Sequence, residues 1–307
     1  MKILIFGSGG VGGYFGSRLL SYNKEVYFIA RGQHLEAIRK HGLRVISKLG
    51  NVHNEVINVS DTVSDFGIVD VVILSVKLYD TANAVKAIKP AIGSKTLLVS
   101  FQNGISGADI LVDTFGPKRV IGGSSSIATR VSEPGVIVHT GSMASLIFGE
   151  WDGGTRPLTE KFFEVCKLAK IDVELSTNIN RVIWSKFVFL SAFSGITCTF
   201  RQPIGPILMD NEKRQLFQNA LEETTKIALA MGIVMPSDLV NQRMTFAEGL
   251  PVDMYSSMYH DLNAGKRLEL PWLSGLVVDL GQKFKINTPA HQFFVEKLSN
   301  YSSGTKN

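Results

Sequence analysis

Three glycines near the start of the chain have a spacing that could bind a phosphate group. Gly7, Gly9 and Gly12 lie in the stretch ILIFGSGGVG and fit the pattern GxGxxG. Apolar residues before the pattern predict a strand, and amphipathic residues after it predict a helix. Glycines in this setting permit a tight turn, close approach of a pyrophosphate and close packing of helix on strand. A purely structural turn is the alternative, but the strand-loop-helix context favours a dinucleotide site, with contacts from Gly7, Ser8, Gly9, Gly10, Val11 and Gly12.

The end of the second predicted strand bears on the choice of dinucleotide. The stretch EVYFIAR, residues 25–31, ends in Arg31 and is followed by Gly32. NAD-binding folds usually carry Asp or Glu at this point to accept the ribose 2′-hydroxyl, whereas an arginine suits the 2′-phosphate of NADP. The sequence therefore favours NADP, with a solvated surface charge as the alternative interpretation of Arg31.

Two polar residues, Lys77 and Asn103, follow later strands of the same predicted sheet. Lys77 ends the stretch VILSVK, and Asn103 ends LLVSFQN. Doubly wound sheets bind ligands at the carboxyl ends of their strands, so both residues would share an edge with the glycines. A lysine after a strand is often only solvated, and Asn-Gly is often only a turn. Their common edge makes both candidates for ligand contact.

A single lysine interrupts a long apolar segment in the second half of the chain. The stretch NINRVIWSKFVFLSAFSGITCTF, residues 178–200, predicts an apolar helix that contains Lys186. Burial there would lower the pKa of the lysine, as a general acid for ketone reduction requires. The alternative is a side chain that extends to the surface.

A third polar group lies in YSSMYHDLNAGKRLELP, residues 255–271. Ser257 and Asp261 share one face of a predicted helix, which Gly265 ends. Glu269 falls just before Pro271, which is expected to begin the next helix. Composition alone makes Glu269 a charge that favours a helix N-terminus.

The order of the predicted elements gives the fold class. A chain of 307 residues favours two domains. Its first half alternates strands and helices, which predicts a mainly parallel sheet covered on both faces. We expect an α/β Rossmann domain over 1–177 and an all-α domain over 178–307. The expected strands are 2–7, 25–31, 69–77, 96–104, 119–130 and 171–176, with a hairpin at 134–150; the expected helices are 11–23, 33–42, 80–92, 157–170, 179–199, 211–231, 236–248, 252–264 and 271–284.

Composition excludes several classes of function. The net charge of +5 comes from scattered lysines and arginines, which argues against a nucleic-acid surface. The six histidines and two cysteines show no metal-ligand spacing, so we expect no metal, and Cys166 and Cys198 are expected to be core thiols in a reducing, cytoplasmic compartment. The apolar stretch 187–200 is shorter than a membrane span, so no membrane segment is expected. Disorder is expected only in the tail, residues 302–307.

On these residues the chain resembles the ketopantoate reductase family, over essentially its whole length. Members of this family join an N-terminal Rossmann domain to a helical C-terminal domain and hold NADPH and substrate in the cleft between them. The most distinctive match is SSMYHDLNAGKRLELPWLSG, because its serines, aspartate and glutamate recur in order at family-like spacing. The other matching stretches are GSGGVGGYFG, the pair Arg31-Gly32, SVKLYDT, FQNG and WSK.

The resemblance implies NADPH-dependent reduction of 2-dehydropantoate (ketopantoate) to pantoate, a step of pantothenate biosynthesis. It implies that Lys186 is the catalytic acid and that Glu269 positions or tunes it and lies at the cofactor. Ser257 and Asn103 would contact the 2-oxo acid, Asn103 would also lie at the cofactor, and Lys77 would lie at the junction of cofactor and substrate. The partners expected are a small 2-oxo acid and, for the protein itself, a monomeric or homodimeric state.

One departure from the family concerns the substrate. In well-known members, asparagines one and two helical turns after the catalytic lysine line the substrate pocket, whereas this chain has Leu190 and Ser194. Leucine cannot hydrogen-bond a substrate hydroxyl. A more apolar 2-oxo acid therefore competes with ketopantoate as the substrate. Two different functions also compete with this one, namely a catalytically inactive NADP-binding sensor and a related dehydrogenase of 3-hydroxy acids or opines.

Overall fold

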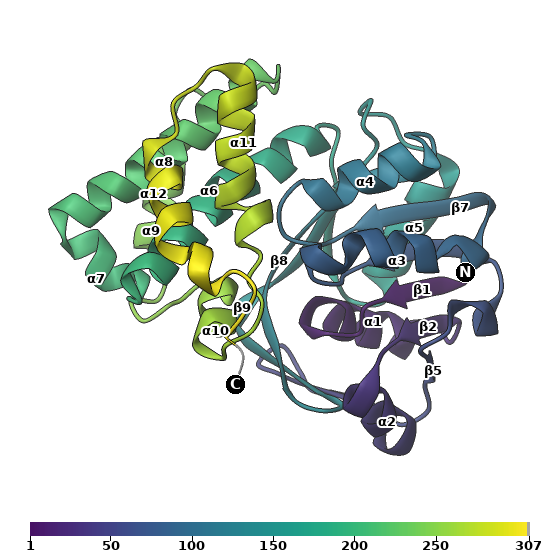
Figure 1. Cartoon of the computed structure of the whole chain (residues 1–307). Coiled ribbons are helices and arrows are strands. Elements are labelled where there is room, and N and C mark those ends of the chain that lie inside the picture. The colour runs from purple at the N-terminus through teal and green to yellow at the C-terminus, as the bar shows by residue number, and fades with distance from the viewer. Residues whose placement is uncertain (306–307) are drawn as a thin grey trace. The chain divides into compact units, whose positions relative to one another are not determined.

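The computed structural model describes residues 1–305 and divides the chain into two compact units, Met1–Val182 and Ile183–Asn307 (Figure 1). The domain limits expected from the sequence, 1–177 and 178–307, stay a prediction. The N-terminal unit is built on one sheet, and the C-terminal unit is helical, as the sequence predicts. The strands are β1 (Ile3–Phe6), β2 (Val26–Ile29), β3 (Leu43–Ser47), β4 (Val52–Asn54), β5 (Asn58–Ser60), β6 (Val69–Leu74), β7 (Ile92–Ser100), β8 (Val120–Glu133), β9 (Val136–Gly149) and β10 (Asp172–Leu175).

Six strands form the doubly wound part of the sheet. They lie in the order β5-β2-β1-β6-β7-β8, and each neighbouring pair is parallel. The order runs outward from β1 in one direction and from β6 in the other. This reversal between β1 and β6 is the topological switch point at which such sheets bind ligands.

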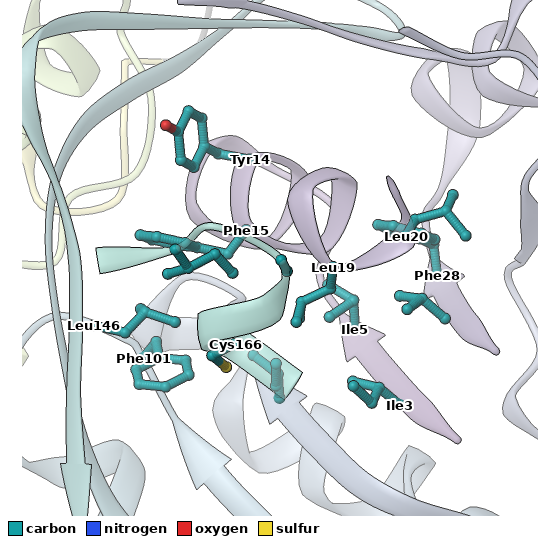
Figure 2. Close-up of a cluster of buried hydrophobic side chains, with 14 of the residues drawn as sticks. Ile3, Ile5, Tyr14, Phe15, Leu19, Leu20, Phe28, Phe101, Leu146 and Cys166 are labelled. Carbon is teal, nitrogen blue, oxygen red and sulfur yellow. The ribbon is translucent and has the colours of Figure 1, made fainter. Parts of the chain in front are cut away.

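Successive strand residues point to opposite sides of the sheet. Because the strands carry apolar residues on both sides, helices cover both faces. On one face, Ile3 and Ile5 pack with Phe15 and Leu19 of helix α1 (Gly10–Tyr22), as Figure 2 shows. On the other face, Leu4 and Phe6 share a cluster with residues of α3 and α4. The helices of this unit are α1, α2 (Gly32–His41), α3 (Thr81–Ala87), α4 (Ser106–Phe115) and α5 (Pro157–Leu168).

A long antiparallel hairpin of β8 and β9 extends the sheet. Its turn is at Pro134 and Gly135, where Gly135 has a positive φ of 79°. The predicted hairpin within 134–150 is wrong, because this segment is one strand that pairs with β8 over its length. Gly141, with a φ of 80°, interrupts β9 at an irregularity in the pairing rather than reversing the chain. Helix α4 and strands β3, β4 and β5 are not predicted from the sequence; the three strands are only three to five residues long.

The C-terminal unit packs around helix α6 (Ile179–Phe200), whose first residues fall in the N-terminal unit. The Phe189 ring contacts Phe217 and Phe246 on two other helices, and Gly195 lets the Phe294 ring approach closely. The predicted helices at 236–248, 252–264 and 271–284 begin later than expected, and two helices were missed. The helices are α6, α7 (Ile204–Met209), α8 (Asn211–Ala230), α9 (Leu239–Glu248), α10 (Ser257–Asn263), α11 (Ser274–Phe284) and α12 (Pro289–Leu298).

Helix α6 extends beyond the apolar stretch 187–200 in the N-terminal direction. By length and composition it could cross a membrane, with a mean hydropathy of 1.4 over its most apolar window. However, 72% of that window is buried inside the protein, which is the pattern of a core helix. Both cysteines are free and buried, as expected, and burial raises the pKa of Cys198 to about 12.

The segment expected to be disordered is ordered in its described part. The Leu268 N–H donates to the Ser302 carbonyl at 3.0 Å, and the Thr305 N–H donates to the Gly265 carbonyl at 3.1 Å. These bonds hold residues 302–305 against the segment that leads into Glu269. Residues 306 and 307 of the predicted disordered tail lie outside the described residues.

Candidate active site

The three motif glycines have three different surroundings in the N-terminal unit. Gly7 has a φ of 105°, a backbone conformation that this turn needs and that glycine adopts more readily than other residues. A Cβ on Gly12 would lie 2.2 Å from the Gly7 carbonyl oxygen and from Ser75 Oγ, so this glycine permits close packing of α1. A Cβ on Gly9 would meet no protein atom within 4 Å. Gly9 therefore faces open space at the N-terminus of α1, where no side chain caps the helix.

This arrangement fits a dinucleotide pyrophosphate. The first N–H groups of a helix lack partners within it and attract an anion. The absence of a side chain at Gly9 leaves room for that anion to approach the backbone. Gly7 thus makes the turn and Gly12 permits the packing that the motif predicts, whereas the approach of a pyrophosphate to Gly9 stays a prediction.

Ser8 and His34 anchor the glycine loop through hydrogen bonds to β2 and to the hairpin turn. The Ser8 hydroxyl donates to the Ile29 carbonyl at 3.1 Å, and its N–H donates to the same oxygen at 3.2 Å. His34 Nδ1 accepts from the Gly135 N–H at 3.0 Å, so Nε2 carries the proton and donates to the Ser8 carbonyl at 2.8 Å. Ser8 thus supports the loop through bonds within the protein.

The strand register brings the other predicted N-terminal residues to the same edge. Phe6 pairs with Ile29 and with Leu74, and Leu74 pairs with Ser100. Each candidate lies a few residues beyond one of these strand ends. The four are the glycine loop after β1, Arg31 after β2, Lys77 after β6 and Asn103 after β7.

Arg31 is exposed at the start of α2. Its guanidinium is therefore accessible from solvent beside the edge that carries the glycines. Gly32, with a φ of 54°, follows it and begins the helix. This position is the one at which dinucleotide-binding folds contact the ribose 2′ substituent.

Side-chain hydrogen bonds link the loops along this edge. Ser75 Oγ donates to the Gly7 carbonyl at 2.8 Å, which ties the loop after β6 to the glycine loop. Gln102 Nε2 donates to the Val76 carbonyl at 2.9 Å, which ties the loop after β7 to the loop after β6. Ser125 Oγ donates to the Phe101 carbonyl at 3.1 Å, which ties β8 to the same loop. The candidate ligand contacts are thus carried by a connected set of loops.

In the C-terminal unit, Lys186 and Glu269 interact electrostatically. Lys186 is partly buried in the second turn of α6, whereas Glu269 is 3% exposed. Burial lowers the pKa of the Lys186 ammonium from 10.5 to about 8, and the Glu269 carboxylate acts in the opposite direction and raises this pKa. Lys186 is therefore mainly protonated at neutral pH but gives up its proton more easily than an ordinary lysine.

Glu269 precedes a short 3-10 turn, Leu270–Trp272, rather than an α-helix. Helix α11 begins only at Ser274, so the predicted helix start at Pro271 is three residues early. A carboxylate that only favoured a helix N-terminus would be solvent-exposed at a helix start. Its burial and its interaction with Lys186 instead make Glu269 part of the candidate site.

The two adjacent serines at the start of α10 have different roles. Ser256 is 2% exposed; its hydroxyl accepts from the Tyr259 N–H at 3.2 Å and donates to Thr197 Oγ1 at 2.8 Å. It therefore caps α10 and links it to α6. Ser257 is exposed and free of that structural task, as a ligand contact requires. Ser257 and Asp261 both lie in α10, as predicted, and Gly265 ends it with a φ of 64°.

Leu190 and Ser194 lie one and two helical turns beyond Lys186. Leu190 is partly buried, whereas Ser194 is 1% exposed. The Ser194 hydroxyl is buried without a hydrogen-bond partner in the described part of the chain. Of these two residues, the structure thus leaves only Leu190 partly accessible. Within residues 1–305, no group of three His, Cys, Asp or Glu side chains could hold a metal ion.

Two family models together match most of the chain. The model described as "Ketopantoate reductase PanE/ApbA" matches residues 3–153, and the model described as "Ketopantoate reductase PanE/ApbA C terminal" matches residues 178–302. The chain belongs to the ketopantoate reductase family. The resemblance inferred from its motifs is thereby confirmed, and this family member is an oxidoreductase with a Rossmann fold for a nicotinamide cofactor.

Relatives match the chain over almost its whole length. The chain is 30% identical to an "Uncharacterized oxidoreductase YkpB" of Bacillus subtilis, with 99% of both chains covered. It is also 30% identical to a "2-dehydropantoate 2-reductase" of Pyrococcus horikoshii, with 94% of this chain and 93% of that protein covered. The crystal structure of a PanE/ApbA family ketopantoate reductase from Ralstonia eutropha superposes with a TM-score of 0.90 at 29% identity, covering 98% of each chain. This match confirms the predicted fold class.

Several residues whose hydrogen bonds link the loops of the candidate site are not predicted from the sequence. Ser75 and Thr81 lie in the stretch SVKLYDT, and Gln102 lies in FQNG, two stretches in which the sequence singles out only Lys77 and Asn103. His34 was missed altogether. Short polar residues next to a candidate ligand contact were the available signal, but their bonds depend on the strand order.

Proposed function

We propose that this reductase uses NADPH to reduce a 2-oxo acid, with 2-dehydropantoate as the leading substrate and pantoate as the product. The observation that carries the proposal is Lys186, whose pKa of about 8 suits a general acid, together with the buried Glu269 that interacts with it. A sensor that only bound the cofactor would not need this pair. With ketopantoate as substrate, the enzyme would serve pantothenate biosynthesis.

The N-terminal unit supplies the cofactor site in this proposal. Gly9, Gly10 and the first turn of α1 would hold the pyrophosphate, and Arg31 would hold the 2′-phosphate through charge-assisted hydrogen bonds. The preference for NADP rests on Arg31, because no carboxylate ends β2 to accept a ribose hydroxyl. NADPH, when bound, supplies the hydride.

The C-terminal unit supplies the proton. As the carbonyl oxygen gains charge, the Lys186 ammonium stabilises it and then transfers a proton from Nζ. Glu269 keeps this ammonium protonated at neutral pH, because it opposes the effect of burial. A lower pKa than the ordinary 10.5 makes the transfer easier, and a pKa still above 7 keeps the acid loaded.

Three further residues are proposed to contact the ligands. Ser257 is exposed at the start of α10, so its hydroxyl is available to the polar groups of the 2-oxo acid. Asn103 would bind the same substrate, and Lys77 would lie where cofactor and substrate meet. Both are partly buried on the edge that carries the glycine loop.

A more apolar 2-oxo acid is the second candidate substrate. Leu190 is partly accessible one turn beyond Lys186 and offers no hydrogen bond. Ser194, two turns beyond, is buried, so its hydroxyl does not replace the missing contact. A substrate hydroxyl left unpaired against Leu190 would cost about 1–3 kcal/mol. The observation therefore favours a side chain without that hydroxyl.

The test is NADPH oxidation, followed by absorbance, with a panel of 2-oxo acids that includes ketopantoate and apolar analogues. Turnover of an analogue but not of ketopantoate would support the second candidate, and NADPH binding without any turnover would refute reductase function. Lys186→Ala is expected to lower kcat by at least ~100-fold while NADPH binding is retained. Near-normal turnover in this variant would remove Lys186 from the proposed role.

We also infer a cytoplasmic enzyme, because two free buried thiols and an NADPH requirement both suit a reducing compartment. The monomeric or homodimeric state stays a prediction, which the mass of the purified protein in solution would test.

A further inference from the structure

We propose that Gln102, acting with Thr81, is a positioning residue that fixes Lys77 and Asn103 relative to each other. The proposal concerns loop geometry within the N-terminal unit. Its kinetic test rests on the proposed function, whereas its structural test does not.

The Gln102 side chain bridges two loops. It is 8% exposed, and its Nε2 donates to the Val76 carbonyl at 2.9 Å and to Thr81 Oγ1 at 2.8 Å. Thr81 Oγ1 in turn donates to the Leu78 carbonyl at 2.8 Å. The carbonyls on both sides of Lys77 are thus bound, one directly and one through Thr81.

The same residue fixes the loop after β7. Asn103 follows Gln102 directly in the chain, so the backbone that carries Asn103 is anchored where Gln102 is anchored. Ser100 Oγ donates to Gln102 Oε1 at 3.0 Å and accepts from the Gln102 N–H at 3.3 Å. Both amide hydrogens and the amide oxygen of Gln102 therefore have partners.

The direction of each bond follows from the chemistry. The Val76 and Leu78 carbonyls can only accept hydrogen bonds, so Gln102 must point its NH₂ toward Val76, and Thr81 must donate to Leu78. Thr81 then accepts from Gln102. Only an amide at position 102 supplies both donors and the acceptor, and only a hydroxyl at position 81 can relay the bond.

Thr96 in β7 provides a matched control, because it bonds to the first residue of β6, at the end of that strand opposite to Lys77. Thr96 is 2% exposed; its hydroxyl donates to the Val69 carbonyl at 2.6 Å and accepts from the Gly93 N–H at 2.9 Å. Thr81 is equally buried and also makes one donated and one accepted bond between neighbouring segments. Thr81→Val and Thr96→Val thus remove comparable bonds, but only the first lies beside Lys77.

The experiment compares Thr81→Val, Thr81→Ser, Gln102→Leu and Thr96→Val with the wild type. We expect Thr81→Val and Thr96→Val to lower Tm by similar amounts. Only Thr81→Val and Gln102→Leu should lower kcat/KM, by about tenfold or more, because small displacements of positioned groups slow the reaction strongly. Thr81→Ser keeps the hydroxyl and should therefore have nearly the kcat/KM of the wild type. The double variant Thr81→Val with Gln102→Leu should lose little more than Gln102→Leu alone, because both break one chain of bonds.

Hydrogen exchange reads the positioning without any substrate. We expect faster exchange of the amides of residues 77–80 and 103–105 in Thr81→Val and unchanged exchange there in Thr96→Val. If no 2-oxo acid were reduced by the wild type, the proposed function would fail while this result still supported the positioning role. Equal loss of activity in Thr96→Val, or wild-type exchange and kinetics in Thr81→Val, would overturn the proposal.

Discussion

Replacing Glu269 by glutamine tests its electrostatic link to Lys186 through the pH dependence of the reduction. Lys186 has a pKa of about 8, lowered by burial and raised in part by the Glu269 carboxylate. In the proposed mechanism the reduction requires the protonated lysine, so the rate should be constant at low pH and fall as pH rises through about 8. Glu269→Gln keeps the size of the side chain but removes its charge, which leaves burial unopposed.

The expected shift follows from the two effects. Loss of a nearby opposite charge moves a pKa by about 1–3 units. The falling limb of the pH–rate profile should therefore move from about pH 8 to about pH 7 or below. A shift of about one unit, the smallest expected, would lower the protonated fraction at pH 8 from about one-half to about one-tenth, a loss of about fivefold in kcat. With this shift both enzymes would be largely protonated at about pH 6, and the electrostatic loss would nearly vanish there.

The assay is the initial rate of NADPH oxidation at saturating substrate, from about pH 6 to about pH 10. The matched control is Glu296→Gln, because Glu296 is an exposed glutamate on α12 and the variant has the same net charge. In the reverse direction, oxidation of the hydroxy acid needs unprotonated Lys186, so that rate should rise through the same pKa. A limb unchanged by Glu269→Gln would refute the link, and a wild-type limb near 10.5 would refute the effect of burial.

Three further predictions test the cofactor site and the C-terminal segment. Gly9→Ala should weaken NADPH binding about tenfold or more with little change in Tm, whereas Gly12→Ala should destabilise the protein by about 1–3 kcal/mol, as binding titrations and thermal melts would show. Arg31→Ser should weaken NADPH binding about 10- to 100-fold and leave NADH binding nearly unchanged; equal losses would make Arg31 a mere surface charge. Deletion of residues 302–307 should lower both Tm and kcat, because it removes the bond to the buried Leu268 N–H next to Glu269; full activity would show that the segment is dispensable.

The glycine loop could be predicted from the sequence because its requirements are local. A strand, three spaced glycines and a helix are contiguous, and each glycine has a reason that applies to any such loop. The parallel sheet followed from apolar strands alternating with helices for the same reason. The short strands β3 to β5 were missed because each carries only three to five residues. In addition, β3 and β5 pair with β9 and β2, which are distant in the sequence.

The supports of the site could not be predicted because they depend on strand order. Gln102 reaches the Val76 carbonyl only because β6 and β7 are neighbours, and His34 meets Gly135 although 101 residues separate them. No local pattern marks such a bond. The split between Ser256 and Ser257 is of the same kind, since only the packing of α10 on α6 decides which serine is buried.

The burial of Lys186 has a cost that bears on its role. A fall in pKa from 10.5 to about 8 corresponds to about 3 kcal/mol of lost stability when the lysine is protonated. Because the folded pKa lies below the unfolded one, this cost is fully present below about pH 8 and disappears as pH rises toward 10.5. An apolar residue in this core helix would avoid it. A fold that nevertheless places a lysine there, beside a buried carboxylate, carries a destabilising feature of the kind that occurs at functional sites.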